Sequence, residues 1–186
     1  NYVSLRRELL DAGIQLDTNS DTEVILQLYK MRGKRILKSL RGMFAFVIWD
    51  EKNQQLFAAR DHLGQKPFYY HADSGRFAFS SEIKGLLAYD PSLRELDYQA
   101  LDQYVTLRIV SSPYSMFRRV KKLPPAHCLT YSVDGGLKIE PYWTLEFDPK
   151  DNRSESDILD GLEECLIEAM RLHMVSDVPV GAFMSG

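Results

Sequence analysis

The side chains most suggestive of chemistry close the segment 176–186. Residues 178–184 are largely apolar and predict a short buried strand, which Ser185 and Gly186 follow directly. A glycine allows close backbone approach, and a hydroxyl with backbone amides can donate to phosphate oxygens, particularly where a helix begins next. Ser-Gly after a strand is equally the sequence of an ordinary tight turn. The pair alone therefore fits either a phosphate-binding loop or a plain turn.

Other charged residues have a structural interpretation. Arg60 and Asp61 end a predicted strand, where an exposed ion pair that orders the following turn explains them better than catalysis does. Glu82 and Lys84 are interpreted in the same way. No catalytic role is expected for these four residues.

Cysteines and histidines do not form a metal-binding pattern. Cys128 and Cys165 are far apart and belong to no Cys-x-x-Cys pair, so neither a disulfide scaffold nor a structural zinc site is expected. The histidines are equally scattered along the chain: His62, His71, His127 and His173. No metal ligand is therefore expected.

Four stretches resemble the glutamine-hydrolysing asparagine synthetase family, in the family's order. Residues 40–50, 59–70 and 79–86 resemble its glutaminase domain. Residues 176–186 resemble the entry to its pyrophosphate-binding loop, whose motif is Ser-Gly-Gly-x-Asp-Ser and of which this chain shows the first two residues. Several motifs in order are more specific than any one of them.

The resemblance implies an α+β fold, and the succession of predicted hairpins agrees with it. The glutaminase part is expected to be an Ntn-hydrolase-like αββα sandwich, with two antiparallel sheets between outer helices. It is expected to span residues 1–145, as a type 2 glutamine amidotransferase domain without its N-terminal part. A linker over 146–153 then leads to 154–186, the truncated start of the α/β adenine-nucleotide α-hydrolase-like (ATP pyrophosphatase) domain.

The resemblance also implies an activity for the complete protein. Glutamine hydrolysis gives ammonia, which is tunnelled to β-aspartyl-AMP formed from aspartate and ATP with Mg²⁺. The products are asparagine, AMP and pyrophosphate. The expected partners are glutamine, aspartate and ATP, with a homodimer as a further arrangement.

The family's nucleophile is an N-terminal cysteine whose own α-amino group is the general base. Asn1 and Tyr2 resemble instead the end of the family's Asn-Gly-Glu-Ile-Tyr-Asn motif. The nucleophile, the oxyanion hole and the arginine that clamps glutamine are therefore expected to lie outside this chain. No catalytic residue is assigned, and the chain alone is expected not to hydrolyse glutamine.

Two residues match functional positions of the glutaminase domain. Asp21 matches the family's aspartate in Gly-Ser-Asp-x-Glu, which holds the α-ammonium group of glutamine. A carboxylate in the first turn of a helix also has a structural explanation through the helix dipole. Met43 matches a residue of the ammonia tunnel, where an apolar lining would favour neutral ammonia over ammonium. From its context alone, Met43 is equally a core residue.

In the second domain the resemblance implies an ATP and pyrophosphate site. Phe183 takes the place of a residue whose backbone contacts adenine, and Ser185 and Gly186 begin the pyrophosphate loop.

Two alternatives to this function stay open. An enzyme of the same architecture could use another acceptor, as β-lactam synthetase-like enzymes do, and a non-catalytic Ntn-like domain could serve for binding alone.

The elements that must position these residues follow from periodicity and turn residues. Helical spacing predicts short helices over 3–12, 36–40 and 98–106. Two further helices are predicted with capping residues at their start, one from the Ser20–Glu23 capping box to Gly33 and one from Ser154 to His173. Strands are predicted over 43–49 (buried on both faces), 55–59, 68–71, 76–79, 128–133 and 137–139, with an ordered loop over 111–125.

The composition is that of a globular protein. The 186 residues are 45% hydrophobic and 26% charged, and 23 Lys and Arg against 26 Asp and Glu leave a net charge of −3. Nucleic-acid binders usually carry a clustered basic excess instead. No apolar run is long enough to span a bilayer, and no signal peptide is recognisable. A cytoplasmic location without nucleic-acid or membrane partners is expected.

Overall fold

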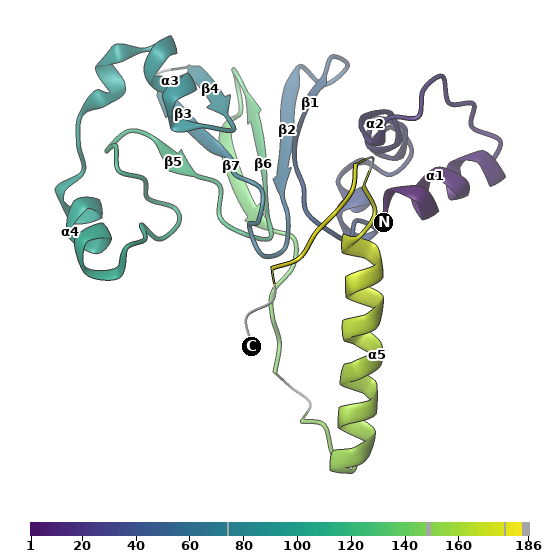
Figure 1. The fold of residues 1–186 in the computed structure, drawn as a ribbon. Coiled ribbons are helices and arrows are strands. Elements are labelled where there is room, and N and C mark those ends of the chain that lie inside the picture. The colour runs from purple at the N-terminus through teal and green to yellow at the C-terminus, as the bar shows by residue number, and fades with distance from the viewer. Residues whose placement is uncertain (74, 148–149, 177, 184–186) are drawn as a thin grey trace. The chain divides into compact units, whose positions relative to one another are not determined.

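The computed structural model describes residues 1–73, 75–147, 150–176 and 178–183 (Figure 1). They form two compact units, one of Tyr2–Thr144 and one of Leu145–Gly186 together with Asn1. The predicted domain limits, 1–145, 146–153 and 154–186, stay a prediction about the complete protein. No helix among the described residues is long and apolar enough to cross a membrane.

Two antiparallel sheets form the centre of the larger unit. The four-stranded sheet has the order β1-β2-β6-β7 and is built from β1 (Ala45–Asp50), β2 (Gln55–Arg60), β6 (His127–Ser132) and β7 (Gly136–Pro141). The three-stranded sheet has the order β4-β3-β5 and is built from β3 (Tyr69–Asp73), β4 (Arg76–Ser80) and β5 (Lys121–Lys122).

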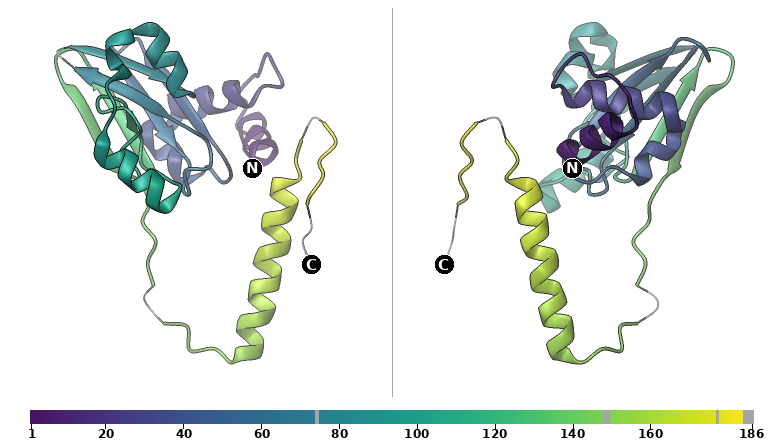
Figure 2. Two further views of the ribbon diagram at one scale, coloured as in Figure 1. Left: turned by 60° about the vertical axis from the view of Figure 1, so that its left-hand side comes forward. Right: turned by 90° about the vertical axis from the view of Figure 1, so that its right-hand side faces the viewer.

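Helices flank both sheets. The four-stranded sheet packs against α1 (Tyr2–Asp11), α2 (Asp21–Arg32) and the 3-10 helix η1 (Gly33–Lys38), through a cluster that includes Leu9, Leu28, Leu37 and Phe57. Figure 2 shows these N-terminal helices over that sheet. The helices that follow β4 are α3 (Ile83–Tyr89), η2 (Pro91–Arg94) and α4 (Tyr98–Leu107).

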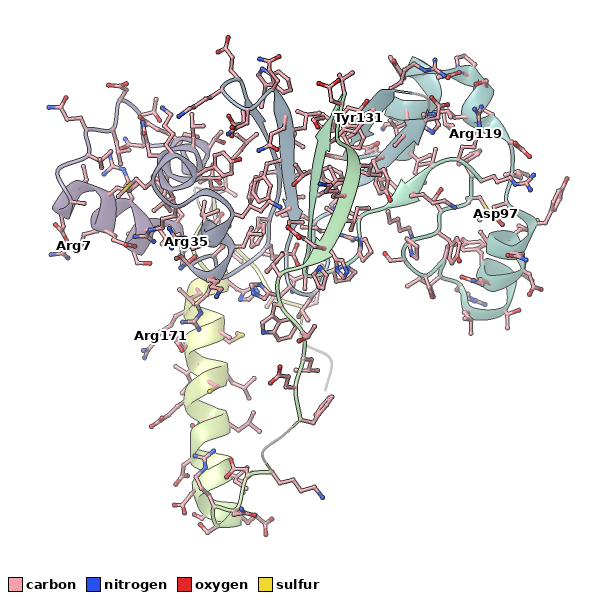
Figure 3. All side chains as sticks on the ribbon, turned by 180° about the vertical axis from the view of Figure 1, so that it is seen from behind. Arg7, Arg35, Asp97, Arg119, Tyr131 and Arg171 are labelled. Carbon is pink, nitrogen blue, oxygen red and sulfur yellow. The ribbon has the colours of Figure 1, made fainter. Side chains whose placement is uncertain are left out.

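The layer between the sheets is apolar and partly aromatic. Ala58, Phe68 and Leu129 are buried there, and burying such side chains is the main favourable contribution to folding. Tyr131 of β6, labelled in Figure 3, stacks on Phe77 of β4 with ring centroids 4.9 Å apart. Together with the outer helices, this layer confirms the predicted αββα sandwich.

The structure corrects three local predictions in this unit. β1 is not buried on both faces: Ile48 is its one buried residue, and Trp49 is 54% exposed. The supposed loop over 111–125 contains β5, which pairs with β3. Ser20 caps α2 by accepting from the Thr22 N–H, but Glu23 does not complete a capping box because its carboxylate accepts from the preceding loop.

The smaller unit contains α5 (Glu155–His173), as its spacing predicts. Its N-cap, Ser154, accepts from the Asp157 N–H over 3.2 Å and donates its hydroxyl to the Asp157 carboxylate over 2.6 Å. The strand predicted at the end of the chain is wrong for residues 178–183, which are irregular. A strand exists only in a ladder with a neighbour, and no other described segment pairs with these residues.

Candidate functional site

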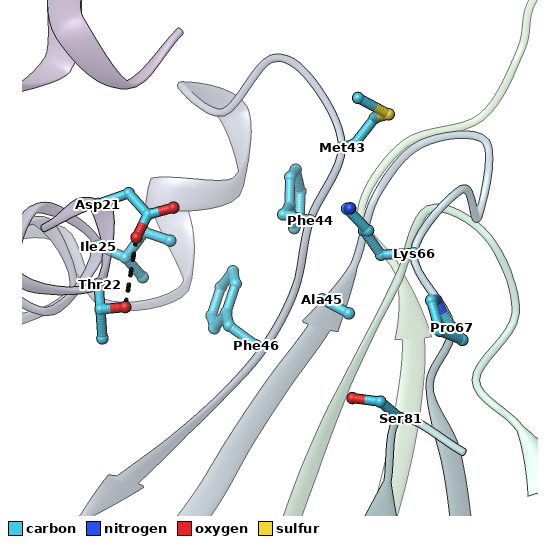
Figure 4. Close-up of a pocket in the computed structure, with 10 residues that line it drawn as sticks. All are labelled: Asp21, Thr22, Ile25, Met43, Phe44, Ala45, Phe46, Lys66, Pro67 and Ser81. Atoms are coloured by element: carbon cyan, nitrogen blue, oxygen red, sulfur yellow. Dashed lines mark hydrogen bonds between the residues drawn. The ribbon is translucent and has the colours of Figure 1, made fainter. Parts of the chain in front are cut away.

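A cavity of about 340 Å³ lies in the larger unit, where three segments meet (Figure 4). The first turn of α2 contributes Asp21, and the entry to β1 contributes Met43 and Phe44. The loop between β2 and β3 contributes Lys66 and Pro67. Volumes near this value are at the lower end of those of small-molecule sites.

The acidic wall of the cavity is the start of α2. Asp21 is the first residue of the helix and is exposed, with one carboxylate oxygen 3.4 Å from the Thr22 hydroxyl, which donates to it. Unpaired N–H groups of a first helical turn favour a negative charge at this place. The Asp21 carboxylate therefore lies at the cavity with most of its acceptor capacity unused by the described residues.

Glu23 fixes the loop that leads into this helix. Its carboxylate accepts from the backbone N–H groups of Asp17 and Thr18, both over 2.8 Å, and from the Thr18 hydroxyl over 2.6 Å. The hydrogen bond from the Thr18 hydroxyl is the largest cause that holds the pKa of Glu23 below its ordinary value. Arg6 adds a hydrogen bond from its guanidinium to the Asn19 side chain. The turn that carries Asp21 is thus held by its own flanking residues.

The opposite wall depends on a buried carboxylate, Asp61, which is 1% exposed. One of its oxygens accepts from the N–H groups of Leu63 and Gln65, and the other accepts from those of Phe44 and Lys66, over 2.9–3.3 Å. The Asp61 N–H donates in turn to the Phe44 carbonyl over 2.8 Å. One side chain therefore joins two of the segments that line the cavity.

Arg60 holds the same loop from its other side. Its guanidinium donates to the carbonyls of Gly64, Lys66 and Leu123 over 2.6–2.7 Å. Gly64 has a φ of +67°, and a Cβ there would meet Pro125 at 2.9 Å and Arg60 at 3.0 Å, so only glycine fits. The expectation of an exposed Arg60–Asp61 ion pair is wrong, because each side chain is hydrogen-bonded to backbone groups and Asp61 is buried. The expectation that they order the turn is confirmed.

Aromatic rings pack beside this loop. The ring of His62 makes edge contacts with Phe44, Tyr142 and Trp143, with centroids 5.2–6.4 Å apart. The Tyr142 hydroxyl donates to the Arg60 carbonyl over 2.8 Å, and burial raises the pKa of this tyrosine. His62 is therefore a packing residue. In the part of the chain that the structure describes, no three His, Cys, Asp or Glu residues are grouped to hold a metal ion.

The comparison with known families identifies the domain that carries this cavity. A model described as the glutamine amidotransferase domain matches residues 1–143, which include every residue of the cavity wall. The chain belongs to this family.

Relatives of this amidotransferase domain match along the whole chain. Glutamine-hydrolyzing asparagine synthetases 1 and 3 of Bacillus subtilis are 37% and 40% identical to it, covering 100% of this chain and 29% and 30% of their own length. The amidase chry2 of Gibberella zeae is 39% identical, covering 100% of this chain and 27% of its own. The chain thus spans under a third of the length of these relatives.

Solved structures agree with the fold. The glutamine phosphoribosylpyrophosphate amidotransferase of B. subtilis aligns with a TM-score of 0.52 and 22% identity, over 78% of this chain and 27% of the other. A structure described as the allosteric regulatory enzyme of purine biosynthesis aligns with a TM-score of 0.54 and 21% identity, over the same shares. The sandwich of the amidotransferase domain is therefore of the Ntn type.

The structure brings two of the predicted site residues together. Asp21 and Met43 line the same cavity of the amidotransferase domain. Phe183 is fully exposed within the smaller unit, whereas Ser185 and Gly186 lie outside the described residues. The roles assigned to all five stay predictions.

Sequence reasoning passed over Lys66, which also lines the cavity. In the sequence, Lys66 stands between a glutamine and a proline and looks like an ordinary surface loop residue. The pair Arg60-Asp61 and the following Gly64 could have indicated that this loop has a fixed conformation.

Cys128 is the cysteine of the amidotransferase domain, and it lies in the hydrophobic core. It is 2% exposed, and burial raises its pKa to about 11, with the Glu140 carboxylate 3.7 Å away as the second cause. A thiol of this kind stays protonated at neutral pH and is a poor nucleophile. Cys128 is therefore a core residue of the sandwich.

Proposed function

We propose that this amidotransferase domain binds L-glutamine in the cavity at the start of α2. We further propose that it belongs to an asparagine synthetase-like ligase in which the amide nitrogen of glutamine is released as ammonia. The family match over 1–143 supports this proposal, as does the similarity to asparagine synthetases along the entire chain. The observation on which it chiefly rests is the exposed Asp21 carboxylate in the wall of the cavity.

In this proposal Asp21 holds the α-ammonium group of glutamine. A carboxylate accepts strong, charge-assisted hydrogen bonds from an ammonium ion. Glu23 supports this role indirectly, because it fixes the loop in front of the helix without occupying the cavity. Asp21 binds the substrate and does not itself break a bond.

Met43 is proposed to guide the released ammonia. Its neighbours in the cavity wall include the rings of Phe44 and Phe46 and the side chain of Ile25. This apolar part of the wall, unlike the Asp21 carboxylate, offers ammonium no partner and so favours neutral ammonia. Ammonia that stays unprotonated remains a nucleophile for the next reaction.

The second half-reaction is proposed for the complete protein only. Aspartate and Mg-ATP would be its substrates, with Phe183 against adenine and Ser185 and Gly186 at the pyrophosphate. Among the described residues no three His, Cys, Asp or Glu are grouped to hold a magnesium ion. A cytoplasmic location and a homodimer belong to the same proposal; the free thiols of Cys128 and Cys165 fit a reducing compartment.

A second candidate function keeps glutamine as donor and changes the acceptor. It is supported by the similarity to a relative that is not named an asparagine synthetase, the amidase chry2, which is 39% identical to this chain. Aspartate and alternative carboxylic acids, supplied one at a time with glutamine and ATP, distinguish the two candidates. Asparagine as the product supports the first, and an amide of another acid supports the second.

The variant Asp21→Asn tests the glutamine site in the complete protein. Loss of the charged partner is expected to raise KM for glutamine about tenfold to a hundredfold, with a smaller change in kcat. Glutamate release measures this half-reaction. Activity with ammonium chloride in place of glutamine should stay at the wild-type level, because exogenous ammonia bypasses the glutamine site.

A matched variant controls for the loss of a surface carboxylate. Asp11→Asn changes an exposed residue at the end of α1, outside the cavity, and should leave KM unchanged. An unchanged KM in Asp21→Asn would contradict the role of Asp21. If the wild-type protein neither binds glutamine nor releases glutamate, the domain is a non-catalytic Ntn-like module and the proposed function is wrong.

A further inference from the structure

The loop between α1 and α2 is hydrogen-bonded to α1 at Asn19, two residues before Asp21 (Figure 1). The Arg6 guanidinium donates to the side-chain oxygen of Asn19 over 3.0 Å, and the Tyr2 hydroxyl donates to the Asn19 carbonyl. A longer hydrogen bond runs from the same guanidinium nitrogen to the Thr18 carbonyl, over 3.5 Å. One residue of the loop is therefore held by two side chains of α1.

Arg6 takes this position although one of its donors stays unused. Its Nε is buried and has no hydrogen-bond partner among the described residues. A buried N–H of this kind costs free energy, because it has lost water without gaining an acceptor. The guanidinium would recover this cost by turning toward water, and its hydrogen bonds to the loop oppose that movement. The neighbouring Arg7, labelled in Figure 3, is instead 85% exposed, with Asp11 at 4.0 Å.

The position of the Asp21 carboxylate depends on its backbone more than on side-chain partners. The described hydrogen bond of this carboxylate comes from the Thr22 hydroxyl and is long, at 3.4 Å. The buried residues of α2 are Val24 and Leu28, which follow its first residue by one and two turns. The place of Asp21 is therefore set by the loop that enters the helix.

Two sets of hydrogen bonds hold this loop, and their effects differ. Glu23 accepts from the backbone N–H groups of Asp17 and Thr18, within the loop and the helix that it opens, and so fixes the shape of the loop. Arg6 belongs to another helix, α1, which is anchored in the hydrophobic core by Leu9. Its hydrogen bonds therefore fix where the loop lies against the core.

We propose that Arg6 is a positioning residue for the glutamine site. By holding Asn19, it places the Asp21 carboxylate at the cavity, whose wall does not include Arg6 among the described residues. The inference rests on the proposed role of Asp21 in binding glutamine, and it adds a residue that acts through Asp21. Arg6 itself makes no contact with the substrate and takes no part in breaking the amide bond.

The variant Arg6→Met tests this role in the complete protein. Methionine fills the space of the arginine stem but donates no hydrogen bond, so Asn19 is released. KM for glutamine is expected to rise about fivefold to tenfold, the effect of one hydrogen bond, while kcat changes by less than about twofold. Activity with ammonium chloride should stay at the wild-type level. Tm should fall by less than about 3 °C, because the unpaired Nε is removed as well.

A double-mutant cycle shows whether Arg6 acts through Asp21. In a protein that already carries Asp21→Asn, the change Arg6→Met is expected to raise KM by less than about twofold, because no carboxylate remains to be placed. Asn19→Ala removes the acceptor from the other side and is expected to reproduce both results. Arg7→Met removes the exposed arginine next in the sequence and should leave KM unchanged. Glutamate release at varied glutamine concentrations measures KM in every variant.

Each outcome decides between the claims. An unchanged KM in Arg6→Met overturns the inference, as does a rise of about fivefold on top of that of Asp21→Asn, and in both cases the role of Asp21 stands on its own test. Equal losses of glutamine-dependent and ammonia-dependent activity would mean that Arg6 only stabilises the fold, and they also overturn it. If Arg6→Met does not fold, Asn19→Ala is judged by the same criteria. If the wild-type protein neither hydrolyses glutamine nor binds it in calorimetry, the proposed function fails and this inference fails with it.

Discussion

At the scale of single residues, the wall of the cavity depends on a side chain that does not line it. Asp61 accepts four backbone hydrogen bonds, two on each oxygen, and so joins the entry to β1 with the loop before β3. A carboxylate is the only side-chain group with two acceptor-only oxygens of this geometry. Its burial was not predictable, because an Arg-Asp pair at a strand end is usually solvated.

The variant Asp61→Asn should therefore be destabilised although it is nearly isosteric. Its amide nitrogen would replace one oxygen and would face two N–H donors, leaving both without an acceptor. The expected loss is about 2–4 kcal/mol of unfolding free energy. Chemical denaturation measures it. Asp134→Asn, in the exposed turn between β6 and β7, is the matched control with an expected change below about 0.5 kcal/mol. Equal stability of the two variants would show that the hydrogen bonds of the Asp61 carboxylate do not stabilise the fold.

At the scale of elements, the Glu23 carboxylate fixes the start of α2, but its hydrogen-bond partners differ from those that the sequence predicts. A Ser-x-x-Glu pattern predicts a capping box, but Glu23 accepts from Asp17 and Thr18 instead of the Ser20 N–H. The Ser20 N–H donates to the Thr18 hydroxyl, which removes the need for a reciprocal bond. Local sequence therefore located the helix start correctly and misassigned one hydrogen bond.

The stability that Glu23 contributes should depend on pH. Its folded-state pKa is below the ordinary value of 4.5, so the fold favours the ionised form. This contribution is fully present above the ordinary pKa, and it is lost as pH falls through the lower, folded value. The difference in Tm between wild type and Glu23→Gln should therefore be largest near neutral pH and shrink below about pH 4.

Thermal unfolding in a series of buffers checks this expectation. Glu51→Gln changes an exposed carboxylate in the turn between β1 and β2 and serves as the control. A difference between wild type and Glu23→Gln that stays constant down to about pH 3 would show that the carboxylate charge has no part in holding the loop.

The strands that the sequence predicts correctly are those that pair with the next strand along the chain. The hairpins β1–β2, β3–β4 and β6–β7 join neighbouring segments through short turns, and their alternation and turn residues are visible in the sequence. β5 was missed because it pairs with β3 across about fifty residues, and two residues give no period to detect. For the cavity, the family resemblance singled out Asp21 and Met43, whereas Lys66 was visible only once the loop conformation was known.

At the scale of the whole molecule, the buried clusters all lie within Tyr2–Thr144. α5, in the other unit, has no buried residue. A unit with its own hydrophobic core is expected to fold alone. The structure therefore predicts that the amidotransferase sandwich does not need the residues after Thr144.

A shortened chain of residues 1–144 tests this expectation. Its Tm should lie within about 3 °C of that of the 186-residue chain, because no core cluster is cut. A chain that ends at Ser132 removes β7 from the four-stranded sheet and should fail to unfold cooperatively. Circular dichroism during heating distinguishes the two. A drop of more than about 10 °C for residues 1–144 would mean that the smaller unit stabilises the larger.

The position of Asp61 also has a consequence for how this domain tolerates change. A substitution that disturbs its hydrogen bonds releases Phe44 and Lys66 at once, so the shape of the cavity and the stability of the sandwich are lost by the same event. Heating should then abolish glutamine binding over the same temperature range in which the sandwich unfolds. Substitution of Lys66 itself is expected to keep the heat resistance of the sandwich, because its side chain makes no hydrogen bond or ion pair among the described residues.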